Sequence, residues 1–162
     1  MGGLTNGYVQ WIMRRASFKP RAFKGVLPCD LFLEYIKANK NNIKPGDCFI
    51  LNLSSSNSKG THFVCFFVLD SRTGEYFDSY GLPSFDSNLN RAFKLTKLDI
   101  SPFKMRLQSD TSQFCGLFCI AYLLCRQVGL PIRTFEQQFN GELHLNDSVA
   151  LELVKMFIEE KT

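Results

Sequence analysis

The segment from Gln108 to Val128 limits what this chain can fold into more than any other part of it. The residue pattern predicts a helix over about 113–128, with Ser112 as its N-cap and the run Gly129-Leu130-Pro131 as its stop. This helix is apolar on all sides, so we expect it to be buried. Its first turn carries Cys115. The sequence therefore predicts a thiol at the beginning of a buried helix.

The other predicted elements describe an α+β domain over residues 1–162, with a central, mostly antiparallel sheet flanked by helices. The clearest signal is a hairpin, in which a strand over 63–69 is followed by a turn at 71–74 and a returning strand over 75–80. The remaining assignments are helices over 9–16 and 30–37, a central strand over 48–53, an ambiguous segment over 88–97 with helix as one alternative, a strand over 103–107, and an amphipathic helix from about Asp147.

Cysteine usage and hydropathy exclude several classes of protein. The chain has six cysteines, and their spacing matches neither a disulfide framework nor a zinc site. No signal peptide is visible, and the longest apolar run is too short to span a bilayer. We therefore expect reduced thiols, no bound metal, no membrane association and no secretion, and we expect a monomer.

The net charge of +4 is concentrated near the N-terminus. Five basic residues precede the first acidic one, Asp30, and aromatic residues lie between them. The basic residues are Arg14, Arg15, Lys19, Arg21 and Lys24. The segment 1–29 therefore has two interpretations, a solvated basic face or a surface that attracts DNA or another acidic partner.

Cys115 and His62 form a candidate pair of nucleophile and general base. The N-terminus of a helix and a neighbouring imidazolium both favour the thiolate, which is the nucleophilic form of cysteine. His62 lies where a polar loop meets the hairpin strand, a position from which a rigid element can present it to a cleft. The other histidine, His144, lies in a polar segment and is expected to be exposed. The alternatives are a buried core cysteine and a histidine bonded to backbone.

Asp78 is the candidate third member, because it lies on the returning strand of the same hairpin among aromatic residues. A carboxylate in such surroundings usually has a partner, and a bond to Nδ1 of His62 would fix the tautomer of the ring. Asp70 and Asp86 are weaker candidates, since they lie where aspartate is favoured for turn chemistry alone.

Gln108 is the candidate oxyanion donor. Acyl transfer passes through a tetrahedral oxyanion, and the side-chain amide of Gln108 with the N–H of Cys115 could stabilise it. The alternative is an ordinary surface glutamine. Gly116 follows the thiol directly, and a residue without a side chain would let a substrate backbone approach the nucleophile.

Taken together, these residues resemble the adenain family, the adenovirus-type cysteine proteases. That family carries the pattern Q-S-x-x-S-x-x-C-G-L-F-C, an earlier G-x-H-W and a later F-[DE]-P-F-G. The matching residues here are Gln108-Ser109, Ser112 and Cys115-Gly116-Leu117-Phe118-Cys119, then Gly60-Thr61-His62-Phe63 and Phe77-Asp78-Ser79-Tyr80-Gly81. The resemblance covers about half of the chain, from Cys48 to Leu124.

The resemblance implies a papain-like, Ulp/adenain-type fold and a thiol endopeptidase in which His62 is the base, Asp78 orients it, Cys115 attacks and Gln108 binds the oxyanion. It also implies cleavage of viral capsid or core precursors near small residues such as Gly-Gly, with Gly60 and Gly116 compatible with a narrow substrate cleft. No cofactor is required, although DNA or a peptide activates members of this family. The implied location is the virion, or the host nucleus or cytoplasm.

Two departures and two alternatives accompany this resemblance. Phe63 replaces the family's tryptophan, and Lys97 lies near the expected position of the cysteine that bonds an activating peptide. Ulp-like isopeptidases share the order His, Asp, Gln, Cys, but their glutamine usually stands six residues before the cysteine rather than seven. A deubiquitinase or deSUMOylase is therefore the alternative, and an inactive module that binds nucleic acid or capsid is a further one.

Overall fold

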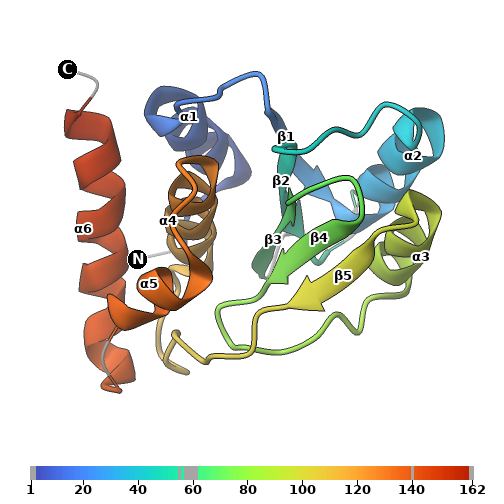
Figure 1. Cartoon of the computed structure of the whole chain (residues 1–162). Coiled ribbons are helices and arrows are strands. Elements are labelled where there is room, and N and C mark those ends of the chain that lie inside the picture. Colours follow the sequence, from blue (N-terminus) through green and yellow to red (C-terminus); the bar gives the residue numbers. More distant parts are fainter. Residues whose placement is uncertain (1–2, 55, 57–61, 140, 161–162) are drawn as a thin grey trace.

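In the computed structural model, a five-stranded sheet separates two groups of helices (Figure 1). The structure describes residues 3–54, 56, 62–139 and 141–160. The strands are β1 (Phe23–Pro28), β2 (Cys48–Asn52), β3 (Phe63–Val68), β4 (Thr73–Phe77) and β5 (Asp99–Pro102). The helices are α1 (Asn6–Ala16), α2 (Cys29–Asn39), α3 (Ser87–Thr96), α4 (Cys115–Gln127), α5 (Ile132–Gln137) and α6 (Asn146–Glu159), with a 3₁₀ turn at Leu143–Leu145.

The sheet has the strand order β1-β2-β3-β4-β5. Strands β2, β3 and β4 are antiparallel neighbours, as predicted, and β3 and β4 form the predicted hairpin. The outer strands differ from the prediction, because β1 and β5 each join the sheet in parallel. A helix connects each outer strand to its neighbour, α2 after β1 and α3 before β5, and a parallel pair needs such a crossover.

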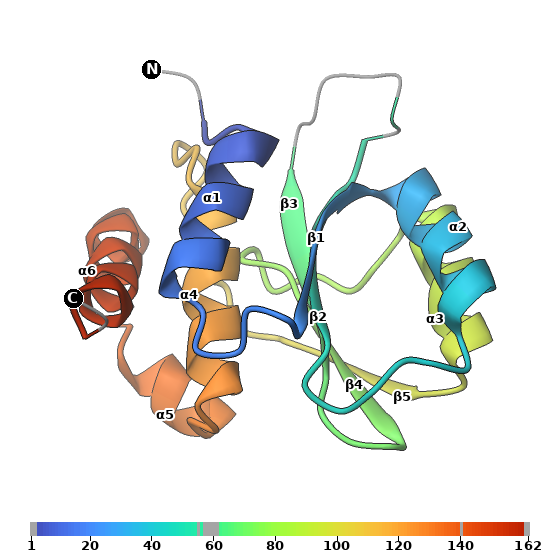
Figure 2. The same cartoon turned by 90° about the horizontal axis from the view of Figure 1, so that it is seen from above.

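Each face of the sheet carries its own apolar core. Cys48 and Ile50 of β2 pack with α1 and α4 on one face, whereas Phe49 and Leu51 pack with α2 and α3 on the other. The two figures agree that α1, α4, α5 and α6 lie on one side of the sheet and α2 and α3 on the other (Figure 2). Because both faces are covered, β2 and β3 are nearly continuous apolar runs rather than alternating ones.

Most predicted elements are confirmed, including the ambiguous segment, which is helix α3. The predicted strand over 103–107 is wrong: β5 ends at Pro102, and residues 103–107 belong to neither helix nor strand. Its buried residues Phe103 and Leu107 alternate with more exposed ones, and their backbone N–H groups donate to the carbonyls of Tyr76 and Ser79. Strand β1, helix α5 and the 3₁₀ turn were not predicted from the sequence.

Helix α4 begins later than predicted, and this matters for the site. Ser112 is not its N-cap; the helix begins at Cys115, and Phe114 precedes it without a side-chain cap. The Ser112 hydroxyl instead donates to Asp147 Oδ1 over 2.7 Å and accepts from the N–H of Phe114 over 3.2 Å. Cys115 is therefore the first residue of a buried helix.

A buried ion pair fixes the sheet to the other end of α4. Arg126 donates from Nε to both carboxylate oxygens of Glu75, over 2.8 and 3.0 Å, and the hydroxyl of Tyr122 donates to Glu75 Oε2 over 3.0 Å. A buried charge without a partner is strongly destabilising, and here each charge has one. This cluster joins β4 to the C-terminal end of α4, and Cys115 lies at the other end of that helix.

No helix in the described part of the chain has both the length and the apolar character to cross a bilayer.

Candidate active site

The register of the hairpin brings His62 beside the residues that follow β4. Cys65 lies opposite Phe77, and continuing this antiparallel pairing places His62 opposite Tyr80. The rings of His62 and Tyr80 pack with centroids 5.1 Å apart. His62 Nε2 lies 2.9 Å from Asp78 Oδ1, so the histidine and the carboxylate predicted from sequence are in direct contact.

The ring nitrogen differs from the one expected. The sequence argument assigned Nδ1 of His62 to the carboxylate, but the structure uses Nε2. Nδ1 is then the ring nitrogen left for Cys115, whose side chain lies close enough to contribute to the raised pKa of His62. Asp78 is held in turn by the N–H of Tyr80, which donates to Oδ1 over 2.8 Å.

Cys115 lies against the beginning of β3. The backbone N–H of Phe63 donates to its sulfur over 3.4 Å, although the two residues are 52 positions apart in sequence. The residue is 8% exposed, and it lines a pocket. As the first residue of α4, Cys115 has a backbone N–H without an acceptor inside the helix. Cys115 therefore lies between the beginning of β3 and the pocket, and its backbone N–H is not used inside α4.

The electrostatics of His62 favour its protonated form. Burial lowers the pKa of His62, but hydrogen bonds and negative charge from Asp78 and Cys115 outweigh burial and raise that pKa from 6.5 to about 9. At neutral pH the ring therefore carries its proton when the two partners are ionised. This is the charge state of an imidazolium–thiolate pair.

Gln108 is fixed at the edge of the same pocket. Its backbone N–H donates to the carbonyl of Ser79 over 3.0 Å, and its Oε1 accepts from the Ser79 hydroxyl over 2.5 Å. These bonds identify Nε2 as the donor end of the amide, and one of its hydrogens bonds the carbonyl of Ser112 over 2.9 Å. The amide nitrogen carries a second hydrogen, and Gln108 lines the pocket.

The pocket that joins these groups has a volume of about 280 Å³. It is lined by residues of the N-terminal segment, the hairpin and the loop before α4: Gly3, Leu4, His62, Phe63, Tyr80, Gln108, Ser112, Gln113 and Cys115. The structure thus brings His62, Asp78, Gln108 and Cys115 together from three separate parts of the chain.

The two candidate substrate-binding glycines have different outcomes. Gly60 lies outside the residues that the structure describes. Gly116 is buried, and a Cβ on it would lie 3.0 Å from a methyl of Val9 and 3.2 Å from the ring of Phe63. This close packing already accounts for the glycine, and a role in substrate approach stays a prediction.

The weaker candidates have local roles. Asp70 accepts from the N–H groups of Arg72 and Thr73 within its turn, and Asp86 is the N-cap of α3, accepting from the N–H of Leu89. His144 is exposed and lies on the 3₁₀ turn. None of these three side chains lines the pocket.

The other five cysteines are buried away from the pocket. Burial raises the pKa of the Cys48 and Cys125 thiols to about 12, and it also raises the pKa of Cys29, Cys65 and Cys119. They are therefore protonated and unreactive at neutral pH. Within the described ranges, no three histidine, cysteine or acidic side chains are grouped so as to hold a metal ion.

Two supporting residues were missed from sequence, Ser79 and Tyr80. Ser79 orients the amide of Gln108, and Tyr80 packs on His62 while its N–H holds Asp78. Both lie in the run Phe77-Asp78-Ser79-Tyr80-Gly81 that carries the family resemblance. The family pattern F-[DE]-P-F-G has an aromatic residue two positions after the acidic one. Tyr80 holds this position relative to Asp78 and could have been identified from it.

The basic N-terminal residues are divided between α1 and the segment that follows it. Arg14 and Arg15 are exposed on α1, and Arg15 lies over the ring of Trp11 at 5.6 Å. Lys24 pairs with Asp47 over 3.3 Å. The ion pair with Asp47 accounts for one of the five basic residues, Lys24. DNA binding by the other four stays a prediction.

Comparison by sequence gives no relative, since no protein-family model and no curated protein matches the chain. Comparison by structure finds proteins of similar fold. The central domain of the uncharacterized Lpg1148 protein from Legionella pneumophila superposes with a TM-score of 0.54 at 11% identity, covering 98% of this chain and 99% of that one.

Two further solved structures are similar. AvrA, solved with IP6 and CoA, gives a TM-score of 0.52 at 18% identity, covering 88% of this chain and 53% of its own. The ASFV pS273R protease gives 0.52 at 16% identity, covering 92% of this chain and 67% of its own. At such identities the likeness concerns the fold. The chain has the α+β fold of the Ulp/adenain-type cysteine proteases. These structural comparisons do not favour adenain over the other proteins of this fold.

Proposed function

We propose that this protein is a cysteine peptidase that hydrolyses polypeptides through Cys115, His62 and Asp78. The observation that carries the proposal is the 2.9 Å contact between His62 Nε2 and Asp78 Oδ1, beside a pocket that His62 and Cys115 both line. A protease among the proteins of similar fold supports it.

The first half of the reaction forms a thioester. In the imidazolium–thiolate pair, Nδ1 of His62 already holds the proton of the Cys115 thiol, and the thiolate attacks the carbonyl carbon of the scissile bond. The oxyanion accepts hydrogen bonds from Nε2 of Gln108 and the N–H of Cys115. The tetrahedral intermediate collapses when His62 gives its proton to the leaving amine, and the C–N bond breaks.

The second half releases the acyl group by hydrolysis. Water enters the place of the amine, His62 takes one of its protons, and the oxygen attacks the thioester carbonyl. The same two donors hold the second oxyanion. Its collapse breaks the C–S bond, frees a carboxylic acid and restores the thiolate beside the protonated His62. Asp78 stays ionised throughout and stabilises the imidazolium.

We further propose that the substrate is a polypeptide cut next to small residues such as Gly-Gly, as in viral precursor maturation. The resemblance to adenain motifs and the small pocket support this. A ubiquitin-like tail also ends in Gly-Gly, so an isopeptidase is the alternative. DNA or peptide activation, and a location in the virion or in the host nucleus or cytoplasm, are further predictions of the same resemblance.

The decisive experiment has two measurements on the same protein. Alkylation with iodoacetamide at neutral pH, followed by mass spectrometry, should label Cys115 before the five thiols whose pKa values burial raises. A library of fluorogenic peptides, with precursor-like and ubiquitin-like members and with DNA present or absent, then tests for cleavage.

Cys115→Ser should abolish cleavage, whereas Cys125→Ser on the same helix should keep it, since Cys125 lies outside the pocket. Cleavage confined to ubiquitin-like fusions would favour the isopeptidase. Uniform labelling of all thiols, or transfer of an acetyl group from acetyl-CoA without any peptide hydrolysis, would contradict the proposal.

A further inference from the structure

The side chain of Arg106, two residues before Gln108, makes three contacts around the candidate active site. Its Nε donates to the backbone carbonyl of Gln108 over 3.1 Å, and its Nη2 donates to Asp110 Oδ1 over 2.5 Å. Its guanidinium carbon lies 5.7 Å from the centre of the Tyr80 ring. Because a guanidinium is planar and carries its donors in a rigid fork, these contacts together fix its orientation.

The stability of the fold does not account for this arrangement. The side chain of Arg106 is 44% exposed, and that of Asp110 is 89% exposed. Ion pairs between such exposed side chains contribute little to the free energy of unfolding, since water and salt screen them. The contacts of Arg106 therefore need another explanation, and the segment that they hold supplies one.

The loop 109–114 leads from the candidate oxyanion donor Gln108 to the nucleophile Cys115. All of its residues are exposed or half-buried. It contains a turn, in which the N–H of Ser112 donates to the carbonyl of Ser109 over 3.2 Å. A loop without a buried side chain depends on neighbouring elements to keep one conformation.

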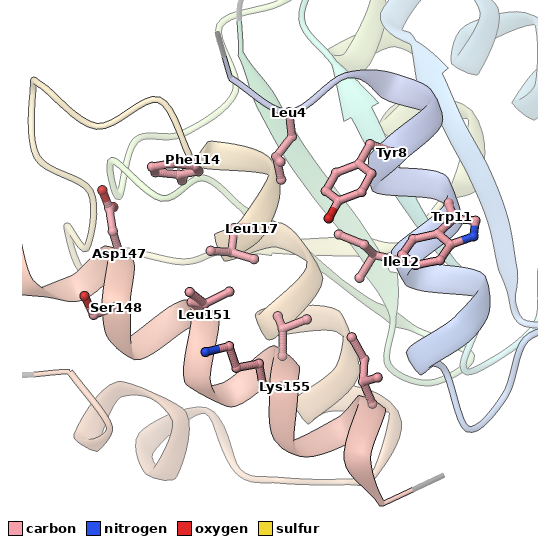
Figure 3. Close-up of a pocket in the computed structure, with 12 residues that line it drawn as sticks. Leu4, Tyr8, Trp11, Ile12, Phe114, Leu117, Asp147, Ser148, Leu151 and Lys155 are labelled. Carbon is pink, nitrogen blue, oxygen red and sulfur yellow. The ribbon is translucent and has the colours of Figure 1, made fainter. Parts of the chain in front are cut away.

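Neighbouring elements hold this loop in both of its halves. In the second half, the Ser112 hydroxyl donates to Asp147 Oδ1 on α6 over 2.7 Å. Asp147 and Phe114, the last residue of the loop, both line the pocket between α1 and α6 (Figure 3). In the first half, Arg106 holds Asp110. The conformation of the loop therefore depends on Arg106 as well as on α6.

The loop in turn sets the direction of the Gln108 amide. Gln108 Nε2 donates to the carbonyl of Ser112 over 2.9 Å, whereas Oε1 accepts from the Ser79 hydroxyl over 2.5 Å. A shift of the loop moves the Ser112 carbonyl and removes one of these two bonds. Arg106 also holds the main chain of Gln108 directly, through its carbonyl. A displacement of about 1 Å in a catalytic group is costly, because the donor must meet the charge where it forms.

We infer that Arg106 is a positioning residue for the oxyanion hole, which fixes the loop 109–114 and the main chain of Gln108 so that the Gln108 amide can meet the oxyanion. This inference rests on the proposed peptidase function and adds to it a residue that does not itself line the catalytic pocket. Arg106 acts on the transition state and not on substrate binding, so its loss lowers kcat and leaves KM nearly unchanged.

The test compares variants on the best-cleaved peptide of the library. Arg106→Ala should lower kcat about 10–10²-fold, which is less than the effect of losing the Gln108 amide itself. Arg106→Lys keeps the charge without the planar fork and should recover only part of kcat. Lys104→Ala removes an exposed cation from the same segment, away from the pocket, and should leave kcat unchanged. The midpoint of urea unfolding should stay the same in all three variants.

A double-mutant cycle identifies the residue through which Arg106 acts. When Gln108 is already alanine, Arg106→Ala should lower kcat by no more than about twofold further, because the amide that it positions is gone. Labelling of Cys115 by iodoacetamide should keep its rate in Arg106→Ala, because alkylation of a thiolate forms no oxyanion. Slower labelling would show that Arg106 supports the nucleophile instead and would overturn the inference.

A peptide aldehyde gives a measurement that does not depend on hydrolysis. The Cys115 sulfur adds to the aldehyde carbon of acetyl-Leu-Gly-glycinal, so that a C–S bond forms and the thiol proton passes to the former carbonyl oxygen. That oxygen occupies the place of the substrate oxyanion. Arg106→Ala should raise the dissociation constant of the aldehyde about tenfold, and Lys104→Ala should leave it unchanged.

The outcomes separate this inference from the proposed function. If the intact protein cleaves peptides but Arg106→Ala keeps its kcat, or if the losses from Arg106→Ala and Gln108→Ala multiply, the positioning role is wrong although the peptidase stands. Complete recovery by Arg106→Lys would also overturn it, since charge alone would then suffice. If nothing is cleaved but Arg106→Ala weakens the aldehyde, the positioning role stands without the peptidase. If the intact protein neither cleaves peptides nor binds the aldehyde through Cys115, both fall together.

Discussion

Replacement of Asp78 with asparagine tests whether the carboxylate keeps the proton on His62. Burial lowers the pKa of His62, yet the hydrogen bonds and charges of Asp78 and Cys115 raise it from 6.5 to about 9. This rise corresponds to about 3 kcal/mol in favour of the protonated ring. Asparagine keeps an oxygen that can accept from Nε2, but it removes the charge.

The expected result is a pKa of His62 that is lower by about one to three pH units in Asp78→Asn, the usual effect of an opposite charge in contact. Burial and Cys115 are unchanged in this variant, so the loss measures the carboxylate itself. A protein with a neutral His62 at pH 7 has lost the imidazolium, and the labelling rate of Cys115 should fall with it.

Proton NMR of the imidazole signals measures this directly, because the chain has only two histidines. The variant His144→Gln assigns the remaining signal to His62. The reasoning is refuted if His62 titrates at or below 6.5 in the unmodified protein, or if Asp78→Asn leaves its titration unchanged.

The same pKa predicts how stability depends on pH. Because the pKa of His62 is higher in the folded state than in the unfolded state, its contribution is complete below about pH 6.5, declines up to about 9, and is absent above. The difference in unfolding free energy between the intact protein and His62→Gln should therefore shrink by about 3 kcal/mol over this window. A difference in urea unfolding that grows with pH would contradict the sign.

Three other replacements test separate parts of the structure. Gln108→Ala should lower kcat on a cleaved peptide by about 10²–10³-fold, whereas Gln113→Ala in the same pocket should not. Glu75→Ala leaves the buried guanidinium of Arg126 unpaired and should cost about 3–5 kcal/mol in urea unfolding, without changing the labelling of Cys115. Gly116→Ala should cost about 1–3 kcal/mol through overpacking; an unchanged unfolding midpoint with a raised KM would instead indicate a role in substrate approach.

The hairpin and its catalytic candidates were predictable because their signals are local. Strands buried on both faces are short apolar runs, and a turn between two such runs specifies antiparallel pairing. His62 and Asp78 are only 16 residues apart and lie on the two sides of that turn. Their contact therefore follows from a register that the turn itself sets.

The unpredicted elements depend on distant partners. Strand β1 pairs with β2 across helix α2, and β5 is defined by its ladder with β4 rather than by its own residues, of which only part are apolar. The segment 103–107 alternates like a strand, but it has backbone bonds to Tyr76 and Ser79 in place of a ladder. Periodicity reports burial, and burial does not require strand pairing.

The sequence by itself determined the chemical types at the site, an amide and a thiol seven residues apart before a buried helix, and a histidine and a carboxylate on one hairpin. Only the tertiary structure decided that these two halves meet, through a contact between residues 52 positions apart, and that His62 offers Nε2 to Asp78. It also decided that α1 and α6 leave an apolar groove beside Cys115. Local patterns fix which groups a segment presents, whereas their distances arise from helix and sheet packing between segments remote in sequence.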